Sequence, residues 1–337
     1  MIDVLVAGGG PAGLAAAIHG ALAGLEVVVV EPRTTPVDKA CGEGVMPGGV
    51  AALRALGVEV TGRELRGIRY VDGATRAEAS FRDHTGLGIR RTTLHSALHR
   101  RALDLGVRML PGKIGEVRQN ADTVTAAGTT ARWLIAADGL HSPLRRSLGL
   151  ELPNHPHGRY GLRRHYRVEP WTDFVEVHWS RHGEAYVTPV DDDLVGVAIL
   201  SRRRRGYDEH LAAFPALTAS LRGPAATEVR GAGPLRQRVR RRTAGRVLLV
   251  GDAAGYLDAL TGEGIALALA TAGAAIRSLA ADRPEEYERA WTRLTCRHRL
   301  LTGALLAASR RPGTARLIVP AAFRMPPLFS AAVHALQ

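Results

Sequence analysis

A glycine-rich turn follows the first run of apolar residues. Residues 3–7 have the composition of a buried strand, residues 8–13 contain four glycines, and residues 14–23 have the composition of an apolar helix. In such a unit the first glycine permits a tight turn, the middle one lets the backbone approach a pyrophosphate, and the last lets the helix pack on the strand, while free N–H groups of the helix face the anion. The turn therefore predicts a dinucleotide site. Its positions are Gly8, Gly10, Pro11, Ala12 and Gly13.

An acidic residue ends the second predicted strand. Residues 25–30 form this strand and Glu31 follows it, about 20 residues past the glycines. A carboxylate at this place accepts hydrogen bonds from the adenosine ribose hydroxyls and would repel a 2′-phosphate. FAD and NAD therefore fit the site, whereas a 2′-phosphorylated nucleotide does not. Arg33, just beyond Glu31, is assigned to the same site.

Two further stretches of small residues follow predicted strands later in the chain. Residues 132–137 lead into Asp138-Gly139, and residues 247–250 lead into Gly251-Asp252. Small residues at a strand end allow the backbone to approach a planar ring closely. Taken with the N-terminal turn, these stretches indicate FAD rather than a nucleotide in general.

Arginine supplies nearly all of the positive charge. The formal net charge is +13, and Lys39 and Lys113 are the only lysines, which indicates a coding bias more than a designed surface. The arginine-rich runs at 202–205 and 236–242 could bind nucleic acid, an anionic membrane or a nicotinamide cofactor's phosphates, or lie on solvated loops and strand ends. Neither run is interleaved with the aromatic residues that bind single strands, so we expect no nucleic-acid partner.

Cysteine usage and hydropathy favour a cytoplasmic protein. Cys41 and Cys296 are far apart and fit no metal-ligand spacing, so neither a disulfide framework nor a metal site is expected. The first apolar run lacks a preceding basic segment and is soon interrupted by glycines. We therefore expect no targeting segment and no transmembrane helix.

The order of predicted elements indicates an α/β fold of two intertwined domains. Strands alternate with helices early and late in the chain, whereas residues 160–200 show the period of two that is typical of an antiparallel sheet. We expect a Rossmann-like FAD-binding domain of the glutathione-reductase type, an antiparallel-sheet substrate domain and a C-terminal helical tail. The predicted boundaries are 1–70, 88–155 and 243–282 for the FAD-binding domain, 71–87 and 156–242 for the substrate domain, and 283–337 for the tail.

The order of these motifs resembles that of a large family of single-component FAD enzymes, which contains para-hydroxybenzoate-hydroxylase-like monooxygenases and geranylgeranyl reductases. The resemblance covers most of the chain. It implies that the glycine turn and Glu31 hold the ADP half of FAD, and that Arg91 lies near the ribityl chain and the pyrophosphate. It further implies a helix N-terminus, at Gly264, that faces the flavin and favours its anionic reduced form. The remaining cofactor positions that it implies are Asp138, Gly139, Gly251, Asp252, Gly262 and Gly264.

The resemblance leaves the reaction open. The leading hypothesis is an NAD(P)H-dependent monooxygenase: NAD(P)H reduces FAD, oxygen adds to give a flavin hydroperoxide, and an aromatic, polyketide or lipophilic substrate between the flavin and the antiparallel sheet is hydroxylated or epoxidised. The competing enzyme reduces isoprenoid or lipid double bonds. A non-enzymatic alternative is a flavin-bound redox sensor or a membrane-associated binding protein. The oligomeric state stays open, and the tail either caps the FAD-binding domain or contacts a membrane surface or a lipophilic substrate.

Two loops carry candidate catalytic side chains. The stretches 39–45 and 261–265 look closer to the reductases than to the aromatic hydroxylases. The candidates also have plain structural interpretations, such as a small apolar filler for Cys41 and a sheet core residue for Tyr186. The candidate catalytic residues are Cys41, Glu43, Tyr186 and Glu263, with His165, His178 and Asp258 as further side chains of interest.

Overall fold

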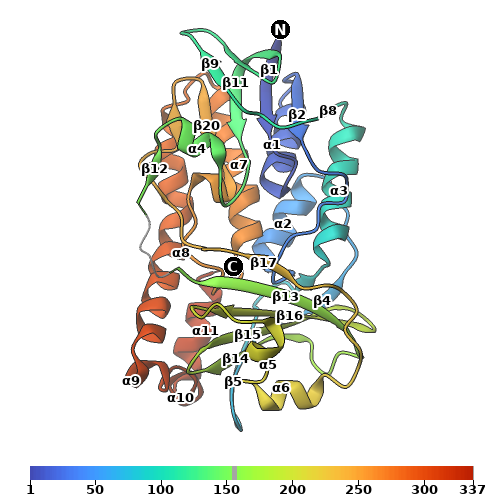
Figure 1. The fold of residues 1–337 in the computed structure, drawn as a ribbon, viewed down its shortest axis with the longest axis vertical. Helices are drawn as coiled ribbons and strands as arrows, with labels where there is room; N and C mark the ends of the chain where they lie inside the picture. Colours follow the sequence, from blue (N-terminus) through green and yellow to red (C-terminus); the bar gives the residue numbers. More distant parts are fainter. Residues whose placement is uncertain (154–157, 337) are drawn as a thin grey trace.

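The computed structural model describes residues 1–153 and 158–336, and within them a mostly parallel sheet forms the first unit (Figure 1). Its eight strands are β1 (Ile2–Ala7), β2 (Val27–Glu31), β8 (Arg108–Pro111), β9 (Val117–Gln119), β10 (Val124–Ala126), β11 (Thr129–Ala136), β19 (Thr243–Ala244) and β20 (Val247–Leu249). The order is β19-β20-β11-β1-β2-β8, with β10 on β11 and β9 on β10. The central strands β20, β11, β1, β2 and β8 are parallel. The glycine turn, Asp138 and Gly251 therefore follow the carboxyl ends of neighbouring parallel strands.

Buried β-branched residues build this sheet, and helices cover its faces. Strand β2 consists of four buried valines followed by Glu31, because β-branched side chains fit a pleated surface covered on both sides. Helix α1 (Pro11–Leu22) packs between α3 (Arg91–Asp104) and α7 (Gly264–Ala280). It begins at Pro11, earlier than the predicted start at residue 14, because proline is well suited to the first helical position. Helix α2 (Pro47–Ala55) also packs on α7.

A second sheet lies below the first in Figure 1. Its seven strands are β5 (Gly67–Asp72), β6 (Thr75–Ser80), β13 (Tyr160–Arg167), β14 (Phe174–Ser180), β15 (Gly183–Asp191), β16 (Leu194–Ser201) and β17 (Arg230–Ala232). The order is β17-β13-β16-β15-β14-β5-β6, and neighbours are antiparallel except for the parallel pair β14–β5. The predicted domain boundary at residue 71 falls inside β5. The chain enters this sheet at Gly67, because β5 is paired along its length with β14 and β6.

The remaining elements before the tail are short. They are β3 (Gly44–Val45), β4 (Arg63–Leu65) and β7 (Gly86–Gly88) in one small sheet, β12 (Glu151–Leu152) paired with β18 (Arg238–Val239), the helices α4 (Pro143–Ser147), α5 (Tyr207–Leu211) and α6 (Pro215–Ser220), and the 3₁₀ helix η1 (Gly251–Ala254). The small sheet lies directly against β15: a Cβ on Gly88 would stand 1.7 Å from the carbonyl oxygen of Pro189. This close approach fixes the second sheet beneath the loop that contains Glu43.

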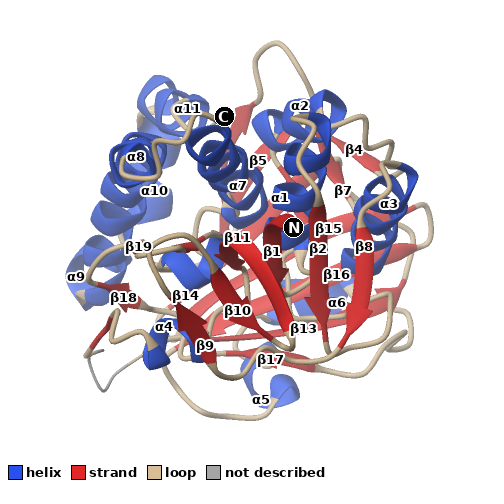
Figure 2. Cartoon of the chain, turned by 90° about the horizontal axis from the view of Figure 1, so that it is seen from above, coloured by secondary structure: helices blue, strands red, loops and turns tan. Residues whose placement is uncertain are grey.

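The tail forms four helices, α8 (Glu286–Arg310), α9 (Pro312–Ala315), α10 (Ile318–Arg324) and α11 (Pro326–His334). Helix α8 packs along α7, while α10 and α11 pack on β6 of the second sheet. Figure 2 shows α8 to α11 gathered on one flank of the molecule. Among the described residues, no single helix is long and apolar enough to cross a membrane, although residues 313–324 and 326–334, bent by 100°, pass as a pair by length and composition.

Candidate functional site

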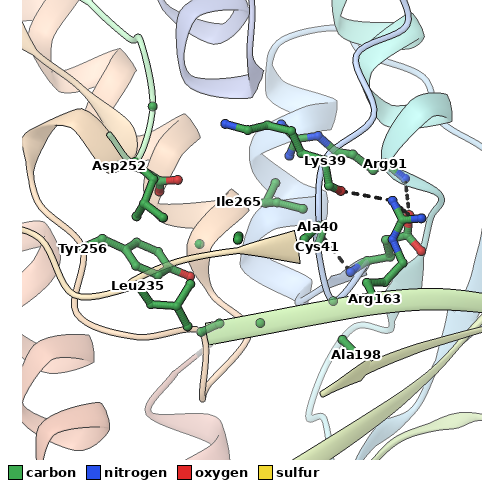
Figure 3. A pocket seen from close by; sticks show the side chains of 18 of the residues that line it. Lys39, Ala40, Cys41, Arg91, Arg163, Ala198, Leu235, Asp252, Tyr256 and Ile265 are labelled. Atoms are coloured by element: carbon green, nitrogen blue, oxygen red, sulfur yellow. Dashed lines mark hydrogen bonds and ion pairs between the residues drawn. The ribbon is translucent and has the colours of Figure 1, made fainter. Parts of the chain in front are cut away.

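A cavity of about 690 Å³ lies between the carboxyl ends of β1 and β11 and the face of the second sheet. The glycine turn and the residues after β11 and β20 line one part of it. Strands β13, β14, β15 and β16 line another part. Figure 3 shows Lys39 and Arg91 on one side of the cavity and Asp252 and Tyr256 on the other. The predicted cofactor residues that line the cavity are Gly10, Pro11, Ala12, Arg33, Arg91, Asp138, Gly139, Asp252, Gly262 and Gly264.

The glycines of the N-terminal turn have different roles. A Cβ on Gly13 would lie 1.8 Å from the carbonyl oxygen of Gly8, and a Cβ on Gly8, whose φ is 103°, would lie 2.6 Å from the carbonyl oxygen of Ala137. These two glycines let the helix and the strands pack. Gly10 is different, because a Cβ there would meet no protein atom within 4 Å. The space beside Gly10 is therefore open to a ligand at the N-terminus of α1.

Glu31 reaches back to the turn. Its Oε2 accepts the Gly9 N–H at 2.7 Å, and its Oε1 accepts the Arg33 Nε–H at 2.7 Å. Burial would raise the pKa of Glu31, but the bonds from Arg33 and Gly9 outweigh burial and lower it. The opposite side of the turn is held by His95, whose Nε2 lies 2.9 Å from the Gly9 carbonyl oxygen. His95 was missed in the sequence, where it is one of several polar residues on a helix.

Three cations gather where a pyrophosphate would lie. Arg33, Lys39 and Arg91 all line the cavity. Burial lowers the pKa of Lys39, the carboxylate of Asp252 opposes this shift, and the charges of Arg33 and Arg91 add to it. A bound diphosphate would offset this repulsion between like charges. Lys39 had not been assigned a cofactor role, although a lysine is conspicuous in a chain that otherwise uses arginine.

A buried arginine joins the second and third motifs. Arg145 donates from Nη1 to the Ala253 carbonyl at 3.2 Å and from Nη2 to the Leu140 carbonyl at 3.0 Å. Asp138 accepts the Leu144 N–H at 3.0 Å and so holds the start of α4. These bonds fix the loop after β11 against the 3₁₀ helix that carries Asp252. Arg145, seven residues after Asp138, was assigned no role from the sequence.

The site has the features that FAD requires. An open glycine backbone lies at a helix N-terminus, three cations lie near it, and the Asp252 carboxylate lines the cavity further along. Burial raises the pKa of Asp252, and Lys39 partly restores its acidity. The N-terminus of α7, where Gly262 has a φ of 72°, lies beyond Asp252 and would face a flavin ring. These residues would hold the pyrophosphate, ribityl and ring portions of FAD respectively.

The candidate catalytic residues separate into two groups. Cys41, Glu43 and Tyr186 line the cavity. Glu263 does not: its side chain turns to α8, where Oε2 lies 3.3 Å from the Nδ1 of His298. Tyr186 donates its hydroxyl proton to the Leu260 carbonyl at 2.8 Å, and burial raises its pKa. Of the further side chains, Asp258 pairs with Arg159 and His178 with Glu176, and none of these four lines the cavity.

Glu43 is the centre of a buried network. Its backbone is left-handed, with a φ of 60°, and its Oε1 accepts the Arg91 N–H at 2.8 Å. Its Oε2 bonds the Nε2 of His165, which lies in β13. Arg163 contacts the Nδ1 of His165 at 3.2 Å. Because arginine only donates, Nδ1 is the acceptor, and Nε2 carries the proton that His165 donates to the Glu43 carboxylate.

Apolar side chains from the second sheet and from neighbouring loops form one wall of the cavity. This wall faces the flavin side of the cavity and shares its residues with the core beneath the tail helices. Val175, Tyr186 and Leu200 come from the second sheet, and Met46, Leu140 and Leu235 come from loops beside it. The site therefore joins a charged half, suited to a dinucleotide, with an apolar half, suited to a lipophilic molecule.

Comparison with known proteins identifies the family. The profile of the FAD binding domain family matches residues 1–286. Menaquinone reductase of Mycobacterium tuberculosis is 32% identical over 308 residues, which cover 80% of this chain and 74% of that protein. Digeranylgeranylglycerophospholipid reductase 1 of Methanothermobacter thermautotrophicus is 29% identical, over 86% of this chain and 81% of its own.

Among solved structures, the flavin-dependent brominase Bmp2 has a TM-score of 0.85, covers 99% of this chain and 93% of its own, and is 16% identical, so the likeness concerns the fold alone. The family profile and the reductase relatives show the family as well as the fold. The chain belongs to the FAD binding domain family, as an FAD-dependent oxidoreductase of the superfamily of para-hydroxybenzoate-hydroxylase-like monooxygenases and geranylgeranyl reductases.

Proposed function

We propose that this oxidoreductase reduces a carbon–carbon double bond in a lipophilic, isoprenoid-containing substrate. The observation that carries the proposal is the apolar wall, to which the second sheet contributes Val175, Tyr186 and Leu200 and which forms the apolar half of the cavity. The reductase names of the relatives at 32% and 29% identity support the same reaction class. This choice departs from the leading sequence-based hypothesis, monooxygenation, and adopts its alternative.

The reaction adds a hydride to one alkene carbon and a proton to the other. Reduced FAD would supply the hydride. The thiol of Cys41 is suited to supply the proton, because burial raises its pKa and keeps it protonated. The Cys41 Sγ accepts the Glu43 N–H at 3.4 Å, which leaves its own S–H to be donated into the cavity. Tyr186 is less suited, since its hydroxyl proton is held by the Leu260 carbonyl.

The charged residues hold the cofactor while the apolar wall orients the substrate. Arg33, Lys39 and Arg91 would fix the pyrophosphate, and the network around Glu43 would keep the 38–43 loop in place above the second sheet. A chain of methylated alkene units would lie along the wall without unpaired polar groups. NAD(P)H as the electron donor stays a prediction, as does the cytoplasmic location.

The test is a single-turnover reaction with a prenylated quinone. FAD-loaded protein is reduced with dithionite under argon and mixed with the quinone, and the mass of the extracted product is measured by mass spectrometry. We expect a gain of two hydrogens in the prenyl chain without oxygen, and little product from the variant Cys41→Ala. A product that forms only in air and gains an oxygen atom would instead establish monooxygenation. No turnover of the prenylated quinone under either gas would refute the substrate class.

A further inference from the structure

The C-terminal part of the chain has a one-sided charge. Between residues 289 and 337 the sequence has eight arginines and no aspartate or glutamate. Three of these arginines, Arg311, Arg316 and Arg324, are exposed on or beside α9 and α10. A basic segment without acidic residues attracts anionic surfaces, and its attraction weakens as salt is added.

The same segment exposes large apolar side chains. The chain bends by 100° between α10 and α11, and the six residues 323–328 at this bend are all exposed. The exposed fractions are 59% for Phe323, 47% for Met325 and 62% for Leu328, and that of Leu317, at the start of α10, is 57%. Single exposed apolar residues are ordinary, but several within one short basic segment mark an interaction surface.

The inner faces of α10 and α11 are already occupied. Val319, Phe329 and Val333 are buried, and both helices pack on β6. The pair is therefore held against the second sheet, which suits a surface contact rather than a span. Val319 and Phe329 belong to the same apolar cluster as Val175 and Leu200, which line the cavity. Figure 1 shows α9 and α10 at the end of the molecule that also holds the second sheet.

We propose that residues 311–328 dock this protein on an anionic lipid bilayer. Leu317, Phe323 and Leu328 enter the boundary between headgroups and acyl chains, and Arg316 and Arg324 contact the anionic headgroups. Arginine suits this place, since its apolar stem can lie along the lipid while its guanidinium binds phosphate. Docking is independent of the proposed reaction, because it needs neither substrate nor turnover.

The experiment measures co-sedimentation of the FAD-loaded full chain with phosphatidylcholine vesicles that contain or lack phosphatidylglycerol. The apolar pair Phe323→Ser with Leu328→Ser is expected to weaken binding to anionic vesicles at least tenfold. The charge pair Arg316→Gln with Arg324→Gln is expected to weaken binding to anionic vesicles about 30-fold, because each arginine contributes about a fivefold change. Bound flavin absorbance and the thermal midpoint verify that each variant is folded.

Matched controls separate docking from the general positive charge of +13. Leu22→Ser with Leu103→Ser removes two apolar side chains of similar exposure, 50% and 48%, from α1 and α3. Arg54→Gln with Arg100→Gln removes two exposed arginines from α2 and α3. Both controls should bind like the unmodified chain. The proposal is overturned if the unmodified chain does not bind anionic vesicles or if the controls lose as much binding as the tail variants. It is also overturned if the double variant Phe323→Ser with Leu328→Ser instead abolishes a dimer of this chain.

Discussion

Replacing Gly10 by alanine tests the cofactor site with little disturbance to the fold. The backbone of Gly10, with φ −72° and ψ 178°, is open to any residue, and an added Cβ would meet no protein atom within 4 Å. The stability of the apoprotein should therefore change by less than about 1 kcal/mol. A methyl group would instead occupy the space that the account assigns to the pyrophosphate.

The size of the effect follows from the cost of an overfilled contact. Inserting a methyl group into a close-packed contact costs about 1 to 3 kcal/mol, which weakens FAD binding about 5- to 140-fold. The measurement is a titration of apoprotein with FAD, followed by the quenching of flavin fluorescence, together with thermal unfolding of the apoprotein.

Gly13→Ala is the matched comparison. Its Cβ would lie 1.8 Å from the Gly8 carbonyl oxygen, so the apoprotein should lose more than about 3 kcal/mol of stability. If Gly10→Ala binds FAD as tightly as the unmodified protein, the pyrophosphate does not lie over residue 10. If it destabilises the apoprotein as much as Gly13→Ala, the space beside Gly10 is not open. Either result refutes the reasoning.

Three further predictions follow from the site. Glu43→Gln places an amide where the backbone N–H of Arg91 and the Nε2–H of His165 converge, so the free energy of unfolding should fall by about 1 to 3 kcal/mol, as measured by thermal unfolding. If Glu43→Gln destabilises the protein no more than His165→Asn does, the carboxylate contributes nothing beyond its contact with His165. Burial lowers the pKa of His95 to about 4, so the unfolded chain takes up a proton near pH 6.5 that the folded chain does not. The free energy of unfolding should therefore fall as the pH is lowered from 6.5 to about 4. Urea unfolding should show a weaker pH dependence for His95→Gln, which keeps a donor for the Gly9 carbonyl. Ala198 lies in β16 and lines the cavity, so Ala198→Phe fills part of the space beside the apolar wall and should raise the KM for the prenylated substrate at least tenfold, while equal FAD affinity in the titration shows that the cofactor half is intact.

Local sequence patterns predicted the strands, the turn and the helix that line the charged half of the cavity. The strand, turn and helix around Gly8 to Gly13 lie within a few residues of their predicted bounds, because spacing along one short segment decides them. The motifs at Asp138 and Gly251 also follow buried parallel strands, as expected from their apolar runs. Family membership, which rested on these motifs in order, is confirmed.

Contacts between distant segments could not be predicted in the same way. Glu43 meets His165 across 122 positions, which depends on how the second sheet packs beneath the 38–43 loop. Glu263 lies in a loop that reaches the flavin side, yet its side chain turns to His298 because α8 packs along α7. The domain boundary within β5 is a similar case, because the pairing of β5 with β14 and β6 reveals where the second sheet begins.

The central claim, double-bond reduction by reduced FAD, is tested most directly by the absorbance of the flavin in the absence of oxygen. Dithionite-reduced, FAD-loaded protein is mixed with a prenylated quinone analogue whose quinone ring is blocked against reduction, and the flavin absorbance is recorded by stopped flow. We predict that the oxidised spectrum returns at a rate that rises with substrate concentration and falls in the variant Cys41→Ala. A flavin that stays reduced until oxygen is admitted would contradict double-bond reduction.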